Sequence, residues 1–563
     1  MQRGISSENA LSAELSDDQV HNLGAAYQNK KNVSVRPLDW ASMLSVLGAG
    51  YAHALSMAWP FGQIGELATG QAWGGLQLAS LAVLVWQLQS VKRGIHGALI
   101  GWLFATSMLC GTFWWLFISM HLYGGLAATL AVLAIFGLAA ALALYYAAAA
   151  AMYVWLAPRS SLGRASVFAA LWLLAELARV KLFTGFPWGE GGYAHIDGWA
   201  RPLAGWVGVH GLTWLAAFTA TLFATLSFQA RRGRWIFKSS SSMACVAVLL
   251  IAFGASVLPP TDLTVPAGNT ARPTLSVTLL QGNIPQDLKF QPGTGVIDAL
   301  RFYGTQLLQT QTSLVVLPET ALPMLPEQLP ADYWQAVKNR FASGEQAALM
   351  GIPLGSSHDG YSNSVLGLKP GATDYRYDKH HLVPFGEFVP LFFHWFIRMM
   401  EIPLGDFNRG TLAQAPFEWH GERLAPNICY EDLFGEEMGA NFKDVTTAPT
   451  IMVNVSNIAW FGNTVAIDQH LHISRMRALE FSRPMLRATN TGATVVINTQ
   501  GRVTHALERH TRGALIAEVQ GADGLTLHAR WVSRFGLAPW WLLGLATVLL
   551  AWWARKRQAQ PLA

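Results

Sequence analysis

The most constraining feature of the sequence is a succession of apolar stretches long enough to cross a lipid bilayer. A transmembrane helix needs roughly 20 apolar residues. Such stretches occur approximately at residues 41–59, 72–91, 95–120, 122–156, 165–183, 203–228, 243–258 and 535–554. Since a backbone exposed to lipid must satisfy its own hydrogen bonds, each is expected to be helical. The sequence therefore predicts a membrane α-helical bundle of eight transmembrane helices.

Composition and the placement of basic residues agree with this prediction. Only 13% of the residues are charged, against roughly 25% in an ordinary soluble protein. Lysine and arginine cluster beside alternate ends of the apolar stretches, which orients a membrane protein and gives no reason to expect a nucleic-acid partner. The clusters are Lys92 and Arg93, Arg159 and Arg164, Arg231, Arg232 and Arg234, and Arg555, Lys556 and Arg557. Both termini are therefore expected in the cytoplasm.

Four regions follow from these patterns. Residues 1–39 are polar and are interpreted as a disordered cytoplasmic extension, and residues 40–258 as a seven-helix transmembrane domain. Residues 259–534 lack long apolar runs and are predicted to form a catalytic domain on the periplasmic side. Residues 535–563 are predicted to be the last transmembrane helix and a basic cytoplasmic tail.

The segment 259–534 alternates strand-like with helix-like pieces, which favours an α/β domain with buried sheets. Strands are predicted at residues 275–280, 314–317, 347–352, 364–368, 451–455 and 494–498. Helices are predicted at residues 296–311, 331–343, 432–442 and 465–482. Composition alone does not separate a two-sheet sandwich from a doubly wound single sheet.

Cys429 is the candidate nucleophile of this segment. It stands between a strand-like run and a helix-like run, where a helix N-terminus favours the thiolate and nearby N–H groups could hold an oxyanion. The alternative is a small buried hydrophobic residue, as expected for Cys110 and Cys245 inside apolar stretches. No disulfide framework is indicated.

Two other positions have a similar setting. Glu319 follows the aliphatic run 313–317, as a residue at the edge of a buried parallel strand would, and Lys379 is crowded by aromatic, proline and acidic neighbours. Each also has an ordinary interpretation, as a solvated residue at a strand end and as an exposed ion-pair lysine.

Glu319, Lys379 and Cys429, in this order, resemble the catalytic trio of the nitrilase (carbon-nitrogen hydrolase) superfamily. Further motifs resemble the apolipoprotein N-acyltransferase family within it, and the likeness extends from about residue 40 to the end. These motifs are GFPWGEGGY (185–193), QGNIPQDLKF (281–290), KHHLVPFGEFVP (379–390), ICYED (428–432), NVSNIAWFG (454–462) and RMRALEFSRPMLRATNTG (475–492). The resemblance implies an αββα sandwich inserted between the seventh and eighth transmembrane helices.

The resemblance also implies roles for individual residues. Cys429 would be the nucleophile and Glu319 its general base, while Lys379 and the backbone N–H of Tyr430 would stabilise the oxyanion. Glu387 and Glu431 would shape the site, and one of them would orient Lys379. Contacts with the lipid substrates are expected from Phe290, Trp460, Phe388, Phe392, Trp395 and Trp188. Phe290 and Ile458 stand where the family usually carries Trp and Asp.

The function that the resemblance implies is acyl transfer in a bacterial inner membrane. An acyl chain would pass from a phospholipid, through a thioester on Cys429, to the N-terminal amine of a diacylglyceryl apolipoprotein. A membrane-tethered amidase of the same superfamily and a non-catalytic binding scaffold are the alternatives. The protein is expected to act as a monomer without a cofactor.

Three further features of the sequence have a functional and an ordinary structural interpretation. His470 and His472, with Asp468, do not share one helical face, so no metal site is expected. Glu176 and Arg179 have the i,i+3 spacing of an ion pair at the outer end of a transmembrane helix. The apolar run 385–404 is predicted to form a mobile arm at the membrane surface, with burial in the domain core as the alternative.

Overall fold

The computed structural model describes residues 39–230, 272–389 and 407–559, together with three isolated positions between 231 and 271. The predicted N-terminal extension and nearly all of the seventh apolar stretch lie outside the described residues. So do Phe392 and Trp395, and with them most of the predicted arm.

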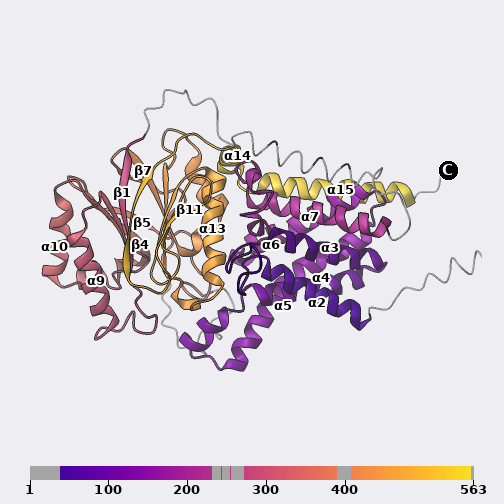
Figure 1. Cartoon of the computed structure of the whole chain (residues 1–563), viewed down its shortest axis with the longest axis horizontal. Coiled ribbons are helices and arrows are strands. Elements are labelled where there is room, and N and C mark those ends of the chain that lie inside the picture. Colours follow the sequence, from indigo (N-terminus) through magenta and orange to yellow (C-terminus); the bar gives the residue numbers. More distant parts are fainter. Residues whose placement is uncertain are drawn as a thin grey trace, which may run out of the picture.

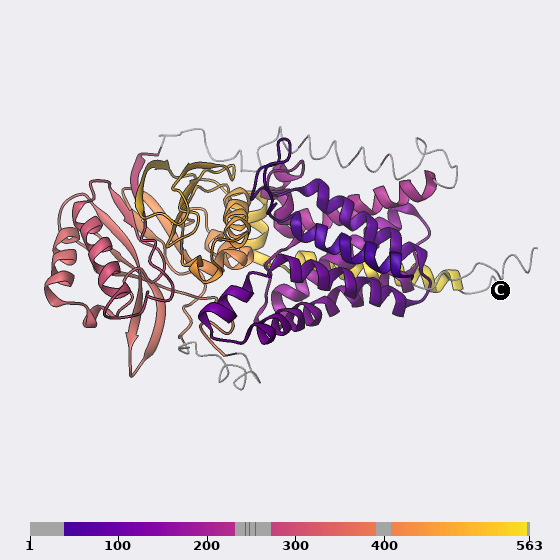
Figure 2. The same cartoon turned by 60° about the horizontal axis from the view of Figure 1, so that its bottom comes forward.

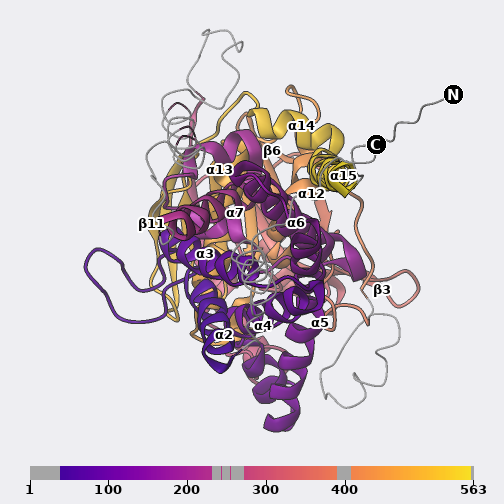
Figure 3. The same cartoon turned by 90° about the vertical axis from the view of Figure 1, so that its right-hand side faces the viewer.

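Long helices form a bundle at one end of the molecule. They lie side by side in Figures 1 and 2, and Figure 3 views the bundle from its far end. The helices are α2 (Trp40–Leu55), α3 (Gly74–Ser90), α4 (Gly94–Thr112), α5 (Ala128–Leu156), α6 (Ser161–Lys181), α7 (Ala204–Ala230) and α15 (Ala538–Ala559). Each coincides with one of the apolar stretches of the sequence.

Not every helix of this bundle is long and apolar enough to cross a membrane alone. Among the described residues, α4, α5 and the helix at Arg201–Leu226 meet that test, and α15 joins them if it is taken with α14 (Leu527–Phe535), which is bent from it by 85°. Helices α2 and α3 have only 16 and 17 residues, and α6 carries Arg164, Glu176, Arg179 and Lys181. The structure therefore supports several apolar helices rather than a count of eight.

The fourth apolar stretch is longer than a bilayer requires. A π-helical turn, η1 (Ile118–Tyr123), precedes the 29 residues of α5. At 1.5 Å per residue α5 is about 43 Å long, against roughly 30 Å of hydrocarbon. A transmembrane helix of this length would have to tilt or extend beyond the hydrocarbon layer.

The remaining chain forms two six-stranded sheets. One has the strand order β12-β1-β2-β3-β4-β5 and the other β11-β10-β9-β8-β7-β6. The strands are β1 (Thr274–Gln281), β2 (Leu314–Val316), β3 (Ala347–Ser356), β4 (Gly360–Leu368), β5 (Tyr375–Asp378), β6 (Phe417–Trp419), β7 (Glu422–Ile428), β8 (Ile451–Ser456), β9 (Met485–Thr489), β10 (Val495–Ile497), β11 (Val503–Ala506) and β12 (Gly513–Gln520). All six predicted strands are present among them.

The two sheets pack face to face, with helices on both outer faces. Aliphatic side chains such as Val277, Val316 and Val453 are fully buried in the core between the sheets. Helices α9 (Gly295–Gln309) and α10 (Ala331–Ala342) lie on the outer face of the first sheet. Helix α13 (Ala466–Phe481) lies between the second sheet and the bundle (Figure 1). The αββα architecture implied by the resemblance is thus confirmed.

One predicted helix is wrong in its extent. The segment 432–442 is divided among η6 (Cys429–Leu433), α12 (Gly435–Gly439) and η7 (Ala440–Phe442). A side chain at Gly435 would collide with the Arg477 guanidinium, whose Nη1 atom would lie only 1.9 Å from the added Cβ. The chain therefore turns closely around Arg477 at this point.

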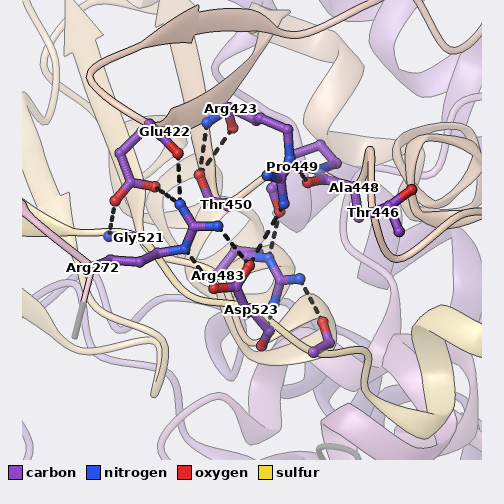
Figure 4. A network of polar contacts seen from close by, with 12 residues as sticks. Arg272, Glu422, Arg423, Thr446, Ala448, Pro449, Thr450, Arg483, Gly521 and Asp523 are labelled. Carbon is purple, nitrogen blue, oxygen red and sulfur yellow. Dashed lines mark hydrogen bonds and ion pairs between the residues drawn. The ribbon is translucent and has the colours of Figure 1, made fainter. Parts of the chain in front are cut away.

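A polar network joins the two ends of the sandwich domain (Figure 4). Arg272, at the start of the domain, pairs with Glu422 at 3.1 Å and with Asp523, which precedes α14. Arg423 also pairs with Asp523, at 3.5 Å, and Arg483 donates to the carbonyl oxygen of Gly524. The chain consequently enters and leaves the sandwich at neighbouring points.

Candidate active site

Three chemically active side chains follow the ends of strands. Glu319 comes three residues after β2 ends, Lys379 directly follows β5, and Cys429 directly follows β7. Neighbouring strand ends at one edge of a sandwich bring their loops together. The structure brings the three predicted residues together, since Lys379 Nζ lies 3.4 Å from Glu319 Oε1 and both charges act on the Cys429 thiol. Glu319 and Lys379 are buried and Cys429 is half-buried.

Cys429 begins the short helix η6 with a backbone φ of +53°, a left-handed conformation that a non-glycine residue rarely adopts. Burial raises the pKa of its thiol to about 12, and the Glu319 carboxylate adds to this shift while Lys379 opposes it. The resting group is therefore the thiol. A nearby base must take its proton before the sulfur can attack.

Glu319 is the candidate for such a base, because its charge acts on the Cys429 thiol. Its Oε1 accepts a hydrogen bond from Asn363 Nδ2 at 2.8 Å and lies 3.4 Å from Lys379 Nζ. Its Oε2 accepts from the backbone N–H of Asn457 at 2.8 Å. Burial opposes ionisation, but Lys379 and Lys289 outweigh it and hold the pKa of Glu319 below its usual value. The carboxylate is ionised and able to accept a proton.

Lys379 is held between two carboxylates. Its Nζ lies 2.9 Å from Glu387 and 3.4 Å from Glu319, and its side chain is 1% exposed. Burial opposes its charge, yet Glu387 and Glu319 raise the pKa of Lys379 above its usual value. The site thus contains a fixed positive charge of the kind that stabilises an oxyanion.

The two supporting glutamates have different positions. Glu387 contacts Lys379 directly and accepts from the backbone N–H of Val383 at 2.8 Å, so it is the carboxylate that orients the lysine. Glu431 accepts instead from Ile428 N at 2.6 Å, from His380 N at 2.6 Å and from other donors nearby. Glu431 therefore fastens the loop after Lys379 to the end of β7.

The side chain of Tyr430 points toward the bundle. Its hydroxyl donates to the carbonyl oxygen of Gly185 at 3.2 Å, and its ring stacks on Phe186. Both partners belong to the loop that follows α6. Tyr430 thus anchors the nucleophile's turn to the bundle, and the oxyanion role of its backbone N–H stays a prediction.

The residues predicted to contact lipid are dispersed. Phe290 is 51% exposed, Phe388 lies under the Arg409 guanidinium at 5.0 Å, and the Trp460 ring packs on Tyr123 at 5.7 Å. Trp188 is instead buried at the junction with the bundle. Its indole donates to Gln469 Oε1 at 2.8 Å, and its ring packs on Trp115 at 4.7 Å.

Buried histidines near the site have protein partners. His470 Nε2 lies 2.9 Å from Asp432 Oδ1 and 3.2 Å from the carbonyl oxygen of Cys429. His472 Nε2 lies 2.8 Å from the carbonyl oxygen of Gly70. The described part of the chain contains no group of three or more His, Cys, Asp or Glu side chains arranged to hold a metal ion.

The predicted ion pair in α6 has another arrangement. Glu176 accepts from the backbone N–H of Gly191 at 3.1 Å, whereas Arg179 donates to the carbonyl oxygens of Phe186 and Trp188 at 2.9 and 2.6 Å. Both side chains are buried. They hold the 185–191 loop against the helix, and the ion pairs of the described residues do not include one between them.

Several residues of the site were not anticipated from the sequence. Asn363 bridges Glu319 and Glu387, the Asn457 amide holds Glu319, and Tyr377 donates to Glu431 at 2.9 Å. Lys289 Nζ donates to the carbonyl oxygen of Glu319 at 3.0 Å. A polar triplet inside β4, Ser362 to Ser364, was the available signal for Asn363.

Two protein families match consecutive parts of the chain. Residues 39–222 match the family described as apolipoprotein N-acyltransferase N-terminal domain, and residues 277–524 match the carbon-nitrogen hydrolase family.

Among solved structures, XC1258 from Xanthomonas campestris, a CN-hydrolase superfamily protein, is 20% identical. It aligns with 47% of this chain and 96% of its own, with a TM-score of 0.34.

Curated relatives match nearly the whole chain. Apolipoprotein N-acyltransferase of Verminephrobacter eiseniae is 54% identical over 89% of this chain and 93% of the relative. The protein of that name from Ralstonia nicotianae is 42% identical over 95% of this chain and 97% of the relative. The chain therefore belongs to the apolipoprotein N-acyltransferase family.

Proposed function

We propose that the protein transfers an acyl chain from a phospholipid to the N-terminal amine of diacylglyceryl apolipoproteins, with Glu319, Lys379 and Cys429 as the catalytic residues. The observation that supports this proposal is the proximity of these side chains, with Lys379 paired to Glu319 and both charges acting on the Cys429 thiol. Family membership supports the substrate classes, and the apolar helices support a position of the site beside a membrane.

In the first half-reaction, Glu319 takes the proton of the Cys429 thiol while the sulfur attacks the ester carbonyl of the phospholipid. Lys379 and the Tyr430 N–H stabilise the oxyanion. The carbonyl carbon–oxygen bond then breaks, and Glu319 returns the proton to the leaving oxygen. The products are a lyso-phospholipid and an acyl thioester on Cys429.

In the second half-reaction, the acceptor amine in its neutral form attacks the thioester carbonyl. Glu319 takes a proton from the attacking nitrogen, the carbon–sulfur bond breaks, and the proton passes to the sulfur. The products are an amide and the resting thiol. Because one sulfur carries the acyl chain between two substrates, the kinetics should be ping-pong.

The proposed topology has eight transmembrane helices, with both termini in the cytoplasm and residues 259–534 in the periplasm as a domain inserted before the last helix. The basic clusters at the span ends support this orientation. A reporter active only in the cytoplasm and fused after Gly360 should be silent. A signal from that fusion would overturn the topology.

Mass spectrometry provides the test of function. The purified protein is incubated with phospholipid alone, and the Cys429 peptide should gain the acyl mass as lyso-phospholipid is released. Cys429→Ala should abolish both signals, and Glu319→Gln should bind lipid but fail to form the thioester. Lyso-phospholipid that appears only after acceptor is added, with no acyl mass on Cys429, would contradict the covalent mechanism.

A further inference from the structure

A second buried lysine lies behind the proposed base. Lys289 belongs to the segment after β1 and is 3% exposed. Its Nζ donates to the main-chain oxygen of Glu319 rather than to a carboxylate. Within residues 39–230, 272–389 and 407–559, no carboxylate lies within ion-pair distance of it. A buried ammonium of this kind is costly and needs an electrostatic reason.

The two carboxylates of the site supply that reason. Asn363 Nδ2 donates at 2.8 Å to Oε1 of both Glu319 and Glu387, so the two acids converge on one nitrogen. They also share a single ammonium, Lys379, at 3.4 and 2.9 Å. Two buried carboxylates this close repel each other, and one tends to retain a proton unless further positive charge is present.

We infer that Lys289 supplies the second positive charge, which keeps Glu319 ionised beside Glu387 and so able to take the proton of Cys429. Lys289 is a positioning residue, because it acts through Glu319 and touches no reacting atom. With both lysines charged, the two carboxylates are balanced by two ammonium groups. The inference rests on the proposed function only in assigning Glu319 as the base.

The surroundings of Lys289 agree with this role. The charged and titratable groups around Glu319 are Lys379 and Glu387 from the loop after β5, Cys429 from η6, and Lys289 itself. Burial lowers the pKa of Lys289 to about 8, while Glu319 and Cys429 act in the opposite direction. The ammonium form therefore predominates at neutral pH and below.

Two substitutions separate charge from hydrogen bonding. Lys289→Gln can still donate to the Glu319 carbonyl but has no charge, whereas Lys289→Arg keeps both. The rate of Cys429 acylation by phospholipid is measured from about pH 3 to about pH 8 on the purified full-length protein in detergent, so that the range includes the depressed pKa of Glu319. For the Gln variant, the rising limb of the pH–rate profile should move to higher pH by about one unit. At a given pH on that limb, the acylation rate should therefore fall about tenfold. The Arg variant should keep the wild-type limb.

The controls make the outcome decisive. Lys338→Met, at an exposed lysine paired with Asp374, should behave as wild type. A Gln variant slowed equally at every pH, or as fast as wild type at every pH, would overturn the inference. If that variant does not fold, Lys289→Met, which is also uncharged, takes its place, and the rising limb of its pH–rate profile is compared with that of the wild type.

A second readout is independent of lipid. Alkylation of Cys429 by iodoacetamide reports activation of the thiol by its base, and Glu319→Gln provides the reference for lost activation. One outcome is that the pH profile of alkylation is shifted in Lys289→Gln while the wild type is not acylated by phospholipid. This outcome would contradict the proposed acyl transfer but support the role of Lys289. If the wild type is acylated but the pH profiles of Lys289→Gln are not shifted, the proposed acyl transfer is supported and the role of Lys289 is contradicted.

Discussion

The helices α9 and α13 cover opposite outer faces of the same sandwich, yet they are built differently. Six of the fifteen residues of α9 are buried, and three of them, Ala299, Tyr303 and Leu307, belong to the apolar core with side chains of the first sheet. Thirteen of the sixteen residues of α13 are buried, and seven of them are polar or charged. A solvent-facing helix needs one apolar face, whereas α13 is enclosed between a sheet and a membrane bundle.

Two of the buried polar residues of α13, Gln469 and Glu480, have partners on the bundle. Gln469 Oε1 accepts from the indoles of Trp115 and Trp188, at 3.1 and 2.8 Å. Glu480 accepts from the backbone N–H of Val209 at 2.7 Å, beside the kink of α7. Directional contacts of this kind fix how the sandwich sits on the bundle. They thereby set the position of Cys429 relative to the helical bundle.

The largest expected effect comes from breaking the charged contact in this interface. Arg477 pairs with Glu480 at 2.9 Å, and both side chains are 1% exposed. Arg477→Met leaves Glu480 as a buried charge without its partner, which should lower the free energy of unfolding by about 3–5 kcal/mol. Denaturant unfolding of the purified protein in detergent measures the loss.

The matched substitution on the other helix is Arg301→Met. Arg301 is exposed on α9, so its loss should change the free energy of unfolding by no more than about 0.5 kcal/mol. Equal effects of the two substitutions would mean that the polar residues of α13 do not define its interface.

An intermediate effect is expected from a neutral contact. Gln469→Leu removes the acceptor for two indoles, but Trp115 also reaches the Thr112 carbonyl at 3.0 Å, so Trp188 is the one left unpaired. The cost should be about 1–3 kcal/mol, again read from unfolding in detergent. Gln306→Leu, at a half-buried position of α9, should cost under about 0.5 kcal/mol. A neutral Gln469→Leu would mean that water replaces the lost acceptor.

Elements with a regular apolar pattern could be predicted from the sequence, whereas elements without one could not. Helices α9 and α10 and strands β1, β2, β3 and β8 have clear periodic or apolar patterns, and their positions are predicted within a few residues. The edge strand β11 is exposed along its length, and β9 buries Arg487, so neither has the apolar pattern of a strand. Strand β9 is stabilised by contacts distant in sequence, since it pairs with β8 and Arg487 donates to Asn454, and local patterns do not report such contacts. Strand β11 pairs with the preceding β10 in a hairpin, but its exposed residues give no strand pattern.

The residues of the candidate site also fall into those that the sequence predicts and those that only the structure identifies. Glu319, Lys379 and Cys429 could be named because a resemblance marks them, and their strand-end positions agreed with it. Asn363 and Lys289 acquire their meaning only when separate strands meet, since each is defined by its distance to Glu319. Their residue types alone also fit an ordinary polar strand or loop.

The smallest expected effect is a difference in pH dependence between two aspartates. Asp432, fully buried under α13, lies 2.9 Å from His470 Nε2 and accepts from Ser474. Burial opposes its ionisation, but His470 and Arg487 hold the pKa of Asp432 below its usual value. Asp298 on α9 has a lowered pKa through its hydrogen bonds with Arg512, but that pair is about 40% exposed.

A depressed folded-state pKa stabilises the protein above the unfolded value, and that stability is lost as pH falls through the folded value. The Tm advantage of wild type over Asp432→Asn should therefore shrink as pH falls from about 5 to about 3. The advantage over Asp298→Asn should be small throughout and vanish in about 1 M salt, because exposed pairs are screened. If the Tm advantage over Asp298→Asn depended more strongly on pH than that over Asp432→Asn, burial under α13 would not strengthen the ionic contacts of Asp432.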